Sequence, residues 1–218
     1  MRHLKDIARR LARAPRWMWS QFVAGYLRLR GVRVGRQCRF YGIPRVHRAR
    51  GASISLGHRC VIRSASGSNR YSRGLPTVLS AVVPGAVLTL GEGVRMSDSV
   101  IVCTTSVSIG AETLLGAETL VTDTDSHPAC PECRSAGNPA STGEVLIGRE
   151  CFIGARSIIL KGVVLAPGTC VGAGSIVTEG CCDCGGVLAG VPARAVRHSS
   201  RCTSHQARIE AAGSAHRS

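Results

Sequence analysis

Residues 145–180 read VLIGRE-CFIGAR-SIILKG-VVLAPG-TCVGAG-SIVTEG, and this stretch decides the fold. The third place of every unit is aliphatic: Ile147, Ile153, Ile159, Leu165, Val171 and Val177. The next place is small in four of the six units: Gly148, Gly154, Ala166 and Gly172. A helix would need apolar residues three and four apart, and a simple strand would need them two apart. A period of six is typical of a parallel β-helix.

Each unit of six residues is expected to form one short strand and one corner of a solenoid. Three units then make one triangular coil of about 18 residues, which stacks on the next coil. The aliphatic residue points into the prism, and the small residue lets the chain turn tightly. Neighbouring coils share hydrogen bonds, so their strands are parallel. The sequence therefore predicts an all-β solenoid over residues 31–197.

The repeat also occurs upstream, with two interruptions. Ile54-Ser55-Leu56-Gly57, Leu88-Thr89-Leu90-Gly91 and Val107-Ser108-Ile109-Gly110 have the same form as Val145–Gly148. The pattern lapses at about residues 64–87 and 122–144, which we expect to be excursions from the prism. Loops on a rigid scaffold often carry function.

Composition agrees with a solenoid that needs few aromatic residues. Aromatic residues are 4% of the 218 residues, while Gly numbers 26. No apolar run approaches the roughly 20 residues that cross a bilayer, and the first residues lack the apolar core of a signal peptide. We therefore expect a cytoplasmic protein.

The positive charge is concentrated at one end. Residues 1–50 hold 14 Lys or Arg and one acid, Asp6, which contributes 14 − 1 = +13 of the formal +15. Residues 1–30 read as a basic amphipathic helical extension, which is expected to cap the end of the solenoid, to contact an anionic membrane at its inner face, or to do both. No base-reading motif is present, so nucleic acid is not an expected partner. Residues 198–218 have little apolar content and are predicted to be a disordered tail.

The second excursion contains the residues best suited to chemistry, in the run Val121-Thr-Asp-Thr-Asp-Ser-His-Pro128. Neutral imidazole can accept a proton near neutral pH, so His127 is a candidate general base. Asp125 and Asp123 lie two and four residues before it, where a carboxylate could fix the imidazole tautomer. The competing interpretation is an exposed loop histidine without a role.

The order of these motifs resembles a known family. The His-Pro run, the hexads of residues 145–180 and the closing segment AGVPARAVR (189–197) are similar to hexapeptide-repeat acyltransferases over about residues 54–197. The nearest types are sugar O-acetyltransferases acting on maltose, on galactosides, or on capsule, exopolysaccharide and O-antigen sugars. This resemblance implies a left-handed β-helix, a homotrimer with sites shared between adjacent prisms, and acetyl-CoA as acyl donor. It implies no metal.

The resemblance also implies roles for individual residues. His127 would deprotonate a sugar hydroxyl, which attacks the thioester of acetyl-CoA. The acetyl-CoA positions fall on Ala155, Ala173, Thr178, Arg194 and Arg197.

Three positions depart from the family pattern, and they bear on the two substrates. Glu179 stands where the family has a lysine, so Arg194 and Arg197 are expected to supply the positive charge for phosphate. Asp98 replaces a substrate-facing Asn, and Phe152 replaces a Trp. The acceptor side of the site is therefore expected at Asp98, with Asn69 in the first excursion nearby.

The eleven cysteines include two clusters, Cys130-x-x-Cys133 and residues 181–184. A metal site needs two such pairs brought together, and the second cluster is irregular. We expect reduced thiols and no metal.

Three classes of function remain open. The first is O-acetyl transfer to a glycan or glycolipid acceptor. The second is N-acyl transfer to an amino sugar or another amine. The third is a trimeric scaffold without catalysis. A γ-class carbonic anhydrase also has the left-handed prism but needs three histidine ligands, which this chain lacks at matching coil positions.

Overall fold

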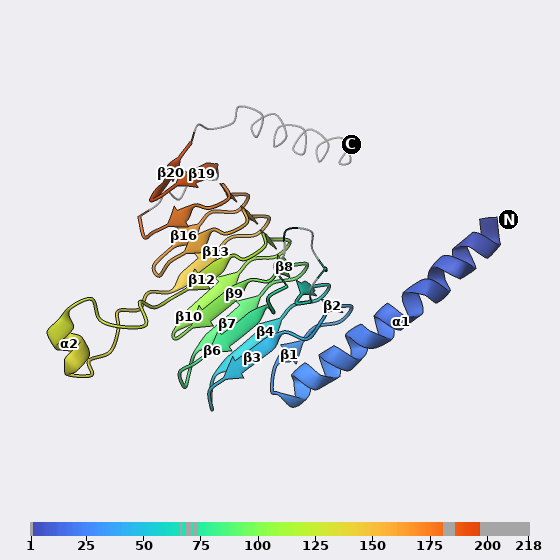
Figure 1. The fold of residues 1–218 in the computed structure, drawn as a ribbon, viewed down its shortest axis with the longest axis horizontal. Coiled ribbons are helices and arrows are strands. Elements are labelled where there is room, and N and C mark those ends of the chain that lie inside the picture. Colours follow the sequence, from blue (N-terminus) through green and yellow to red (C-terminus); the bar gives the residue numbers. More distant parts are fainter. Residues whose placement is uncertain (1, 66, 69–70, 72–73, 181–185, 197–218) are drawn as a thin grey trace, which may run out of the picture.

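The computed structural model describes residues 2–65, 67–68, 71, 74–180 and 186–196, with side chains of the first helix described from residue 16. The tail predicted at residues 198–218 lies outside these residues. The described chain is a left-handed parallel β-helix preceded by one long helix, as predicted (Figure 1).

Three sheets form the walls of the prism. The first wall, sheet A, consists of β1 (Arg33–Val34), β4 (Ser53–Leu56), β7 (Val87–Leu90), β10 (Ser106–Ile109), β13 (Val145–Ile147) and β16 (Val164–Leu165). Sheet B consists of β2 (Arg39–Tyr41), β5 (Val61–Arg63), β8 (Arg95–Ser97), β11 (Leu114–Leu115), β14 (Phe152–Ile153), β17 (Cys170–Val171), β19 (Val187–Gly190) and β20 (Ala193–Ala195). Sheet C consists of β3 (Arg45–Arg48), β6 (Val78–Ala81), β9 (Val100–Cys103), β12 (Leu120–Thr122), β15 (Ile158–Ile159) and β18 (Ile176–Val177). The pairs are parallel except for the antiparallel hairpin of β19 with β20.

The register of the strands explains the period of six. In sheet A, Leu90 pairs with Ile109, Ile109 with Ile147, and Ile147 with Leu165. The last step is 165 − 147 = 18 residues, which is one coil of three units. The six aliphatic residues of the hexads are each at most 1% exposed. They form the ladders that fill the prism, as the sequence predicts.

The corners of the prism are held by close backbone contact and by short side-chain donors. A Cβ on Gly154 would lie 2.4 Å from the amide nitrogen of Ala173 in the next coil, so this corner accepts only glycine without a shift. Ser157 Oγ donates to Gly172 O at 2.9 Å, and so ties one coil to the next. The buried Cys151 thiol donates to Ala166 O at 3.3 Å in the same manner.

The first excursion is shorter than the sequence predicts. The expected lapse over residues 64–87 contains β6, which pairs in parallel with β3 and β9. The prediction missed β6 because a polar, turn-forming run precedes it and a proline stands on each side of its short apolar stretch, at positions 76 and 84. Leu79 occupies the core, fully buried, and the chain turns later, at Gly85.

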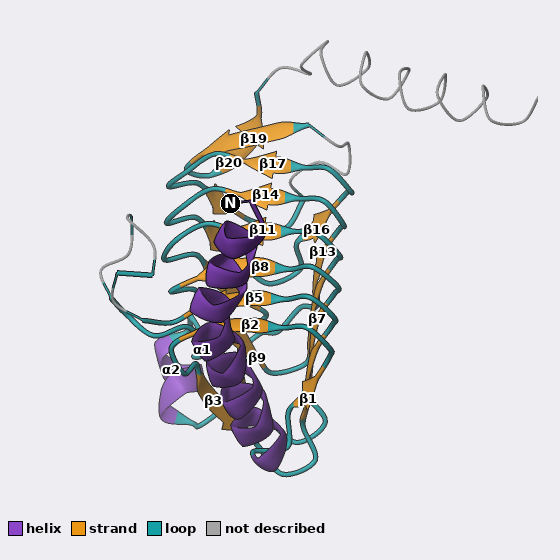
Figure 2. Cartoon of the chain, turned by 90° about the vertical axis from the view of Figure 1, so that its right-hand side faces the viewer, coloured by secondary structure: helices purple, strands orange, loops and turns teal. Residues whose placement is uncertain are grey.

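Helix α1 (Arg2–Leu29) covers the first coil with its C-terminal part. Val23, Ala24 and Leu27 are buried in the same core cluster as Phe40 of β2. Ser20 Oγ accepts a hydrogen bond from Phe40 N at 3.1 Å. The N-terminal part of α1 extends away from the prism (Figure 1), and in the view of Figure 2 it runs in front of sheet B. The helix therefore caps the solenoid over only part of its length.

Neither α1 nor any other helix among the described residues combines the length and the apolarity needed to cross a membrane.

Candidate active site

The segment between β12 and β13 leaves the prism at the corner between sheets C and A. It carries the short helix α2 (Pro131–Ser135), which stands clear of the solenoid (Figure 1). Cys130 is the N-cap of α2, and its Sγ accepts a hydrogen bond from Cys133 N at 3.4 Å. The C-x-x-C motif therefore has a local structural explanation. The second cysteine cluster, residues 181–184, lies outside the described residues.

Asp123 anchors the start of this loop to the preceding coil. Its side chain is fully buried and accepts hydrogen bonds from the backbone N–H groups of Thr104 at 2.7 Å, Thr105 at 2.7 Å and Ser106 at 3.0 Å. Thr104 Oγ1 donates a further bond at 2.8 Å. Both carboxylate oxygens are thus directed to this corner. The structure gives Asp123 a structural task rather than a contact with His127.

The same carboxylate affects a neighbouring thiol. Burial, together with the nearby charge of Asp123, raises the pKa of Cys103 to about 12. Cys103 is fully buried and donates to Val87 O at 3.4 Å. This cysteine is therefore a protonated, enclosed group at neutral pH.

Asp125 connects the two arms of the loop to each other and to a residue of the next coil. Lys161 Nζ contacts Asp125 Oδ2 at 2.7 Å and Ser141 Oγ at 3.2 Å. The backbone N–H of Asp125 also donates to Ser141 O at 3.0 Å. Lys161 was not among the predicted site residues. Its signal in the sequence was that it is one of two lysines in the chain and occupies a corner one coil beyond the loop.

His127 follows this clasp and faces solvent. Its backbone N–H donates to Asp125 O at 2.7 Å, and Ser126 before it adopts a positive φ of 62°. Ser126 N donates to Thr124 Oγ1 at 3.0 Å, which closes the turn. The backbone at His127 is thus fixed by local hydrogen bonds, while its imidazole is exposed.

Three of the five residues predicted to bind acetyl-CoA lie at two corners of the prism. Ala155 and Ala173 follow β14 and β17, at the corner between sheets B and C. Thr178 follows β18, at the corner from which the His127 loop leaves. Arg194 lies in β20 and donates to Ala193 O at 3.0 Å. Arg197 lies outside the described residues.

The predicted acceptor residue Asp98 also lies at the corner between sheets B and C. Asp98 is 2% exposed, has a positive φ of 48°, and donates from its backbone N–H to Arg63 O at 3.0 Å. A hollow of about 400 Å³ lies beside β8, and its lining includes Arg63, Arg95 and Gly116. A Cβ on Gly116 would lie 2.5 Å from Ala155 N, so this hollow adjoins the column of small corner residues. Asn69 lies outside the described residues.

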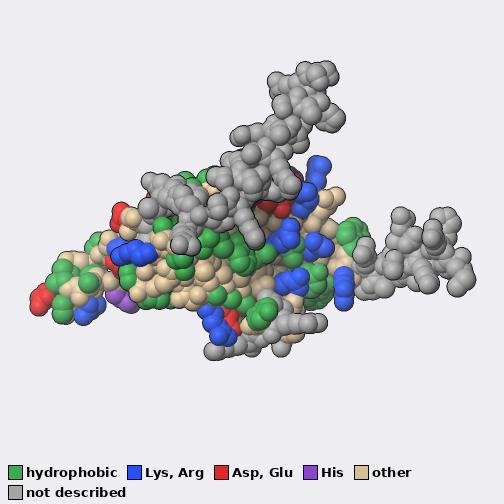
Figure 3. Space-filling model, turned by 90° about the horizontal axis from the view of Figure 1, so that it is seen from above, with side chains coloured by type: hydrophobic (Ala, Val, Ile, Leu, Met, Phe, Trp, Pro, Cys, Tyr) green, Lys and Arg blue, Asp and Glu red, His purple; other side chains and the backbone are tan. Residues whose placement is uncertain are grey.

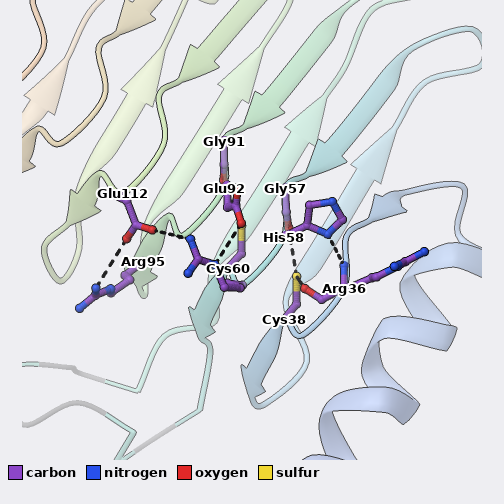
Figure 4. Close-up of polar contacts among 10 residues, drawn as sticks. Arg36, Cys38, Gly57, His58, Cys60, Gly91, Glu92, Arg95 and Glu112 are labelled. Carbon is purple, nitrogen blue, oxygen red and sulfur yellow. Dashed lines mark hydrogen bonds and ion pairs between the residues drawn. The ribbon is translucent and has the colours of Figure 1, made fainter. Parts of the chain in front are cut away.

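A third polar corner, between sheets A and B, is explained by structure alone (Figure 4). Arg59 contacts Glu92 at 3.0 Å and Glu112 at 3.1 Å, with more than two fifths of each of these side chains exposed. His58 Nδ1 accepts a hydrogen bond from the backbone N–H of Arg36 at 2.9 Å. This histidine links two coils and does not compete with His127 as a candidate base.

Two stacked thiols complete that corner. Cys38 Sγ donates to Gly57 O and Cys60 Sγ to Gly91 O, each at 3.2 Å (Figure 4). The hydrogen bond with Cys38, together with burial, raises the pKa of the Cys60 thiol. Across the described ranges, no three His, Cys, Asp or Glu side chains come together in a group that could hold a metal ion.

The comparisons with known proteins agree with this architecture. Residues 144–179 match the family model described as bacterial transferase hexapeptide (six repeats). The protein assigned as lipopolysaccharide biosynthesis O-acetyl transferase WbbJ of Escherichia coli K12 is 29% identical over 150 residues, which is 63% of this chain and 75% of that protein. A 2,3,4,5-tetrahydropyridine-2,6-dicarboxylate N-acetyltransferase of Staphylococcus aureus is 38% identical over 74 residues, which is 34% of this chain and 30% of that protein.

Among solved structures, AntD, an N-acyltransferase from Bacillus cereus, superposes with a TM-score of 0.62. The match covers 87% of this chain and 95% of AntD at 19% identity. AntD was solved with dTDP and 3-hydroxybutyryl-CoA, and in a further structure with dTDP-4-amino-4,6-dideoxyglucose and coenzyme A. At this identity the likeness concerns the fold.

The chain carries the hexapeptide repeat of bacterial transferases, and its fold is that of the acyltransferases built on this repeat.

Proposed function

We propose that this protein transfers the acetyl group of acetyl-CoA to a sugar hydroxyl, in the biosynthesis of a surface polysaccharide. The observation that carries the proposal is the placement of His127. Its imidazole is exposed on the loop that interrupts the solenoid, and its backbone is fixed by a turn. Similarity to the lipopolysaccharide O-acetyl transferase over 75% of that protein supports a sugar acceptor.

In the proposed reaction His127 acts as the general base. The imidazole accepts the proton of the hydroxyl while the hydroxyl oxygen attacks the thioester carbonyl carbon. Backbone N–H groups stabilise the negative charge that develops on the carbonyl oxygen. The C–S bond then breaks, the CoA thiolate takes the proton from the imidazolium, and the ester is released. No covalent enzyme intermediate is required, so no cysteine acts as a nucleophile.

In this mechanism Asp125 positions the loop that carries His127. Its carboxylate pairs with Lys161 at 2.7 Å, and its backbone carbonyl accepts from His127 N at 2.7 Å. The two bonds connect the histidine to a corner of the next coil. Asp123 helps to position the loop indirectly, because its carboxylate binds the start of the loop to the corner at residues 104–106.

Acetyl-CoA is proposed to lie along the column of small corner residues. Ala155 and Ala173 leave space there for the pantetheine arm, and Thr178, Arg194 and Arg197 are the further donor-side residues. His127 and the alanines lie at different corners of one chain, so a homotrimer would bring the histidine of one subunit to the alanines of its neighbour. Asn69 and the corner that holds the buried Asp98 would then form the acceptor side. The complexes of AntD with CoA ligands support an acyl-CoA donor.

The decisive measurement is thiol release from acetyl-CoA with a panel of mono- and oligosaccharides. We expect His127→Ala to lower sugar-dependent release by about 10²–10⁴-fold, the range for a lost general base. The matched control is His47→Ala, because His47 is an exposed histidine in the first coil. Equal release from wild type and His127→Ala would remove His127 from the chemistry.

An N-acyltransferase is the second candidate, supported by the 38% identity to the Staphylococcus aureus N-acetyltransferase over 74 residues. Its acceptor would be an amino sugar or another amine. Mild alkali distinguishes the two products because it cleaves the ester and leaves the amide. A scaffold without catalysis would show neither thiol release nor a change in melting temperature with CoA.

The proposed location is the cytoplasm, where an acyl-CoA donor and reducing conditions are available. The seven cysteines within the described residues are all free thiols, which supports a reducing compartment. Cell fractionation tests the location.

A further inference from the structure

Helix α1 has two unlike faces, and only one of them is used by the fold. Ser20, Val23, Ala24 and Leu27 are at most 5% exposed and pack on the first coil. The opposite side of the same turns is apolar and faces solvent. This second face has no role in the proposed acyl transfer.

The unused face is a continuous apolar stripe. Met18, Phe22 and Leu29 are 64%, 62% and 89% exposed. Their spacing of four and seven residues places them on one side of an α-helix. The sequence continues this spacing towards the N-terminus, with Leu11 seven residues before Met18, and Ile7 and Leu4 three or four residues apart before that.

Two tryptophans border this stripe and are themselves largely exposed. Trp17 is 64% exposed and Trp19 is 42% exposed, and the Trp19 and Phe22 rings lie 5.8 Å apart. A hollow of about 810 Å³ lies between this part of α1 and β2, and Trp17 and Trp19 belong to its lining. The two tryptophans therefore lie beside the packed face of the helix, and both are still accessible from outside.

The charge of the helix identifies the kind of surface that fits it. Residues 2–29 contain seven Lys or Arg and one acid, a sum of 7 − 1 = +6. Lys and Arg side chains gather over the half of the molecule from which α1 extends (Figure 3). An apolar stripe bordered by Trp, on a helix rich in arginine, matches the acyl boundary and the anionic headgroups of a bilayer.

We propose that α1 lies in the surface of an anionic membrane, with Met18, Phe22 and Leu29 inserted and the solenoid on the opposite side of the helix. Because Ser20, Val23 and Ala24 are fixed to the first coil, the membrane would meet the protein at its N-terminal end. This placement is independent of the acyl transfer chemistry. A protein partner or a second copy would explain the stripe but not the excess of positive charge.

The test is co-sedimentation of the full chain with phosphatidylcholine vesicles made with and without phosphatidylglycerol. We expect binding only to the vesicles with phosphatidylglycerol. Binding should be lost as salt is raised, because screening weakens the attraction between the basic side chains and the anionic headgroups. Met18→Asp combined with Phe22→Asp should weaken binding by more than about tenfold. Replacing Arg9, Arg10 and Arg13 by Ser should weaken it by about fivefold for each arginine.

The matched control is Val82→Asp, since Val82 is an apolar residue, 47% exposed, at a corner of the solenoid. It should bind vesicles as wild type does. Equal binding to neutral and anionic vesicles would overturn the proposal. So would a fall in oligomeric mass of the Met18→Asp, Phe22→Asp variant, which would assign the stripe to contacts between copies, or tighter binding to duplex DNA than to vesicles. Thiol release with a water-soluble acceptor should be the same in the Met18→Asp, Phe22→Asp variant and in wild type.

Discussion

Two corners of the same solenoid are constructed in opposite ways. At the corner between sheets B and C, Gly116, Gly154 and Ala173 stack so closely that backbone fills the space above each glycine. At the corner between sheets C and A, the chain leaves for residues 123–144 and is held by a buried carboxylate and an ion pair. The first corner depends on the absence of side chains, and the second on particular side chains. The side chains of the loop at the second corner can therefore differ without disturbing the coils of the prism.

The largest effect is expected where the backbone fills the corner. Gly154→Ala places a Cβ 2.4 Å from Ala173 N, so the coils must separate, and we expect a loss of more than about 3 kcal/mol in the free energy of unfolding. Gly137→Ala is the control, since Gly137 has a φ of +71° but nothing within 4 Å of an added Cβ. It should lose only about 1–2 kcal/mol from backbone strain. Urea unfolding followed by circular dichroism measures both, and equal losses would contradict the comparison.

The next effect concerns the carboxylate at the second corner. Asp123→Ala leaves three backbone N–H groups and one hydroxyl without their acceptor, and we expect a loss of about 3 kcal/mol. Asp123→Asn should lose less, because the amide oxygen still accepts. The kcat per folded molecule should stay close to wild type in Asp123→Asn. A stable Asp123→Ala protein with no activity would instead place this carboxylate in the chemistry.

A smaller change in stability is expected from the ion pair. Lys161→Met should change the free energy of unfolding by less than about 1 kcal/mol, since both partners are partly exposed. It should lower kcat by roughly tenfold, because the His127 loop loses its tie to the next coil. Lys161→Arg should restore most of the activity.

A double-mutant cycle with Asp125→Asn sharpens this point. If Asp125 acts only through Lys161, the double variant should be no slower than either single variant. Additive losses in kcat would mean that the Asp125 carboxylate has a second role beside His127.

The smallest effect is a difference in labelling between cysteines. Burial and Asp123 raise the pKa of Cys103 to about 12, so the folded protein keeps this thiol protonated and unreactive at about pH 8. Cys130 is exposed and should be alkylated. Peptide mass spectrometry after iodoacetamide treatment compares the two sites.

Because folding raises the pKa of Cys103 from 9.0, the free energy of unfolding should decline as pH rises from about 9 towards 12.

The sequence predicted the fold well because the period of six is a local property. Ile147 and Leu165 occupy equivalent places in successive coils, and 18 residues of chain suffice to show it. The first excursion was predicted less well. Its strand β6 has a core residue, Leu79, but it follows a polar, turn-forming run and lies between two prolines. A repeat pattern read from a single chain misses a short strand that is isolated in this way.

The sequence singled out the residues of the candidate site but not the contacts that connect them. His127 stood out because an imidazole and two carboxylates interrupt a regular repeat. The partners of Asp123 lie 17 to 19 residues earlier, and Lys161 lies 36 residues after Asp125. These contacts exist only because the coils stack. Sequence proximity suggested that Asp123 assists His127, whereas in the folded chain its carboxylate binds the corner of the preceding coil.

The position of α1 at the first coil gives the solenoid a further property, that of a spacer with a fixed height. The strands β3, β6, β9 and β12 are consecutive neighbours in sheet C. At about 4.8 Å for each step between strands, the corner that carries His127 stands about 14 Å above the first coil. With α1 on a bilayer, that distance would decide which part of a membrane-anchored glycan is reached. The unit next to the lipid would lie too low, and units that stand clear of the headgroups would be modified.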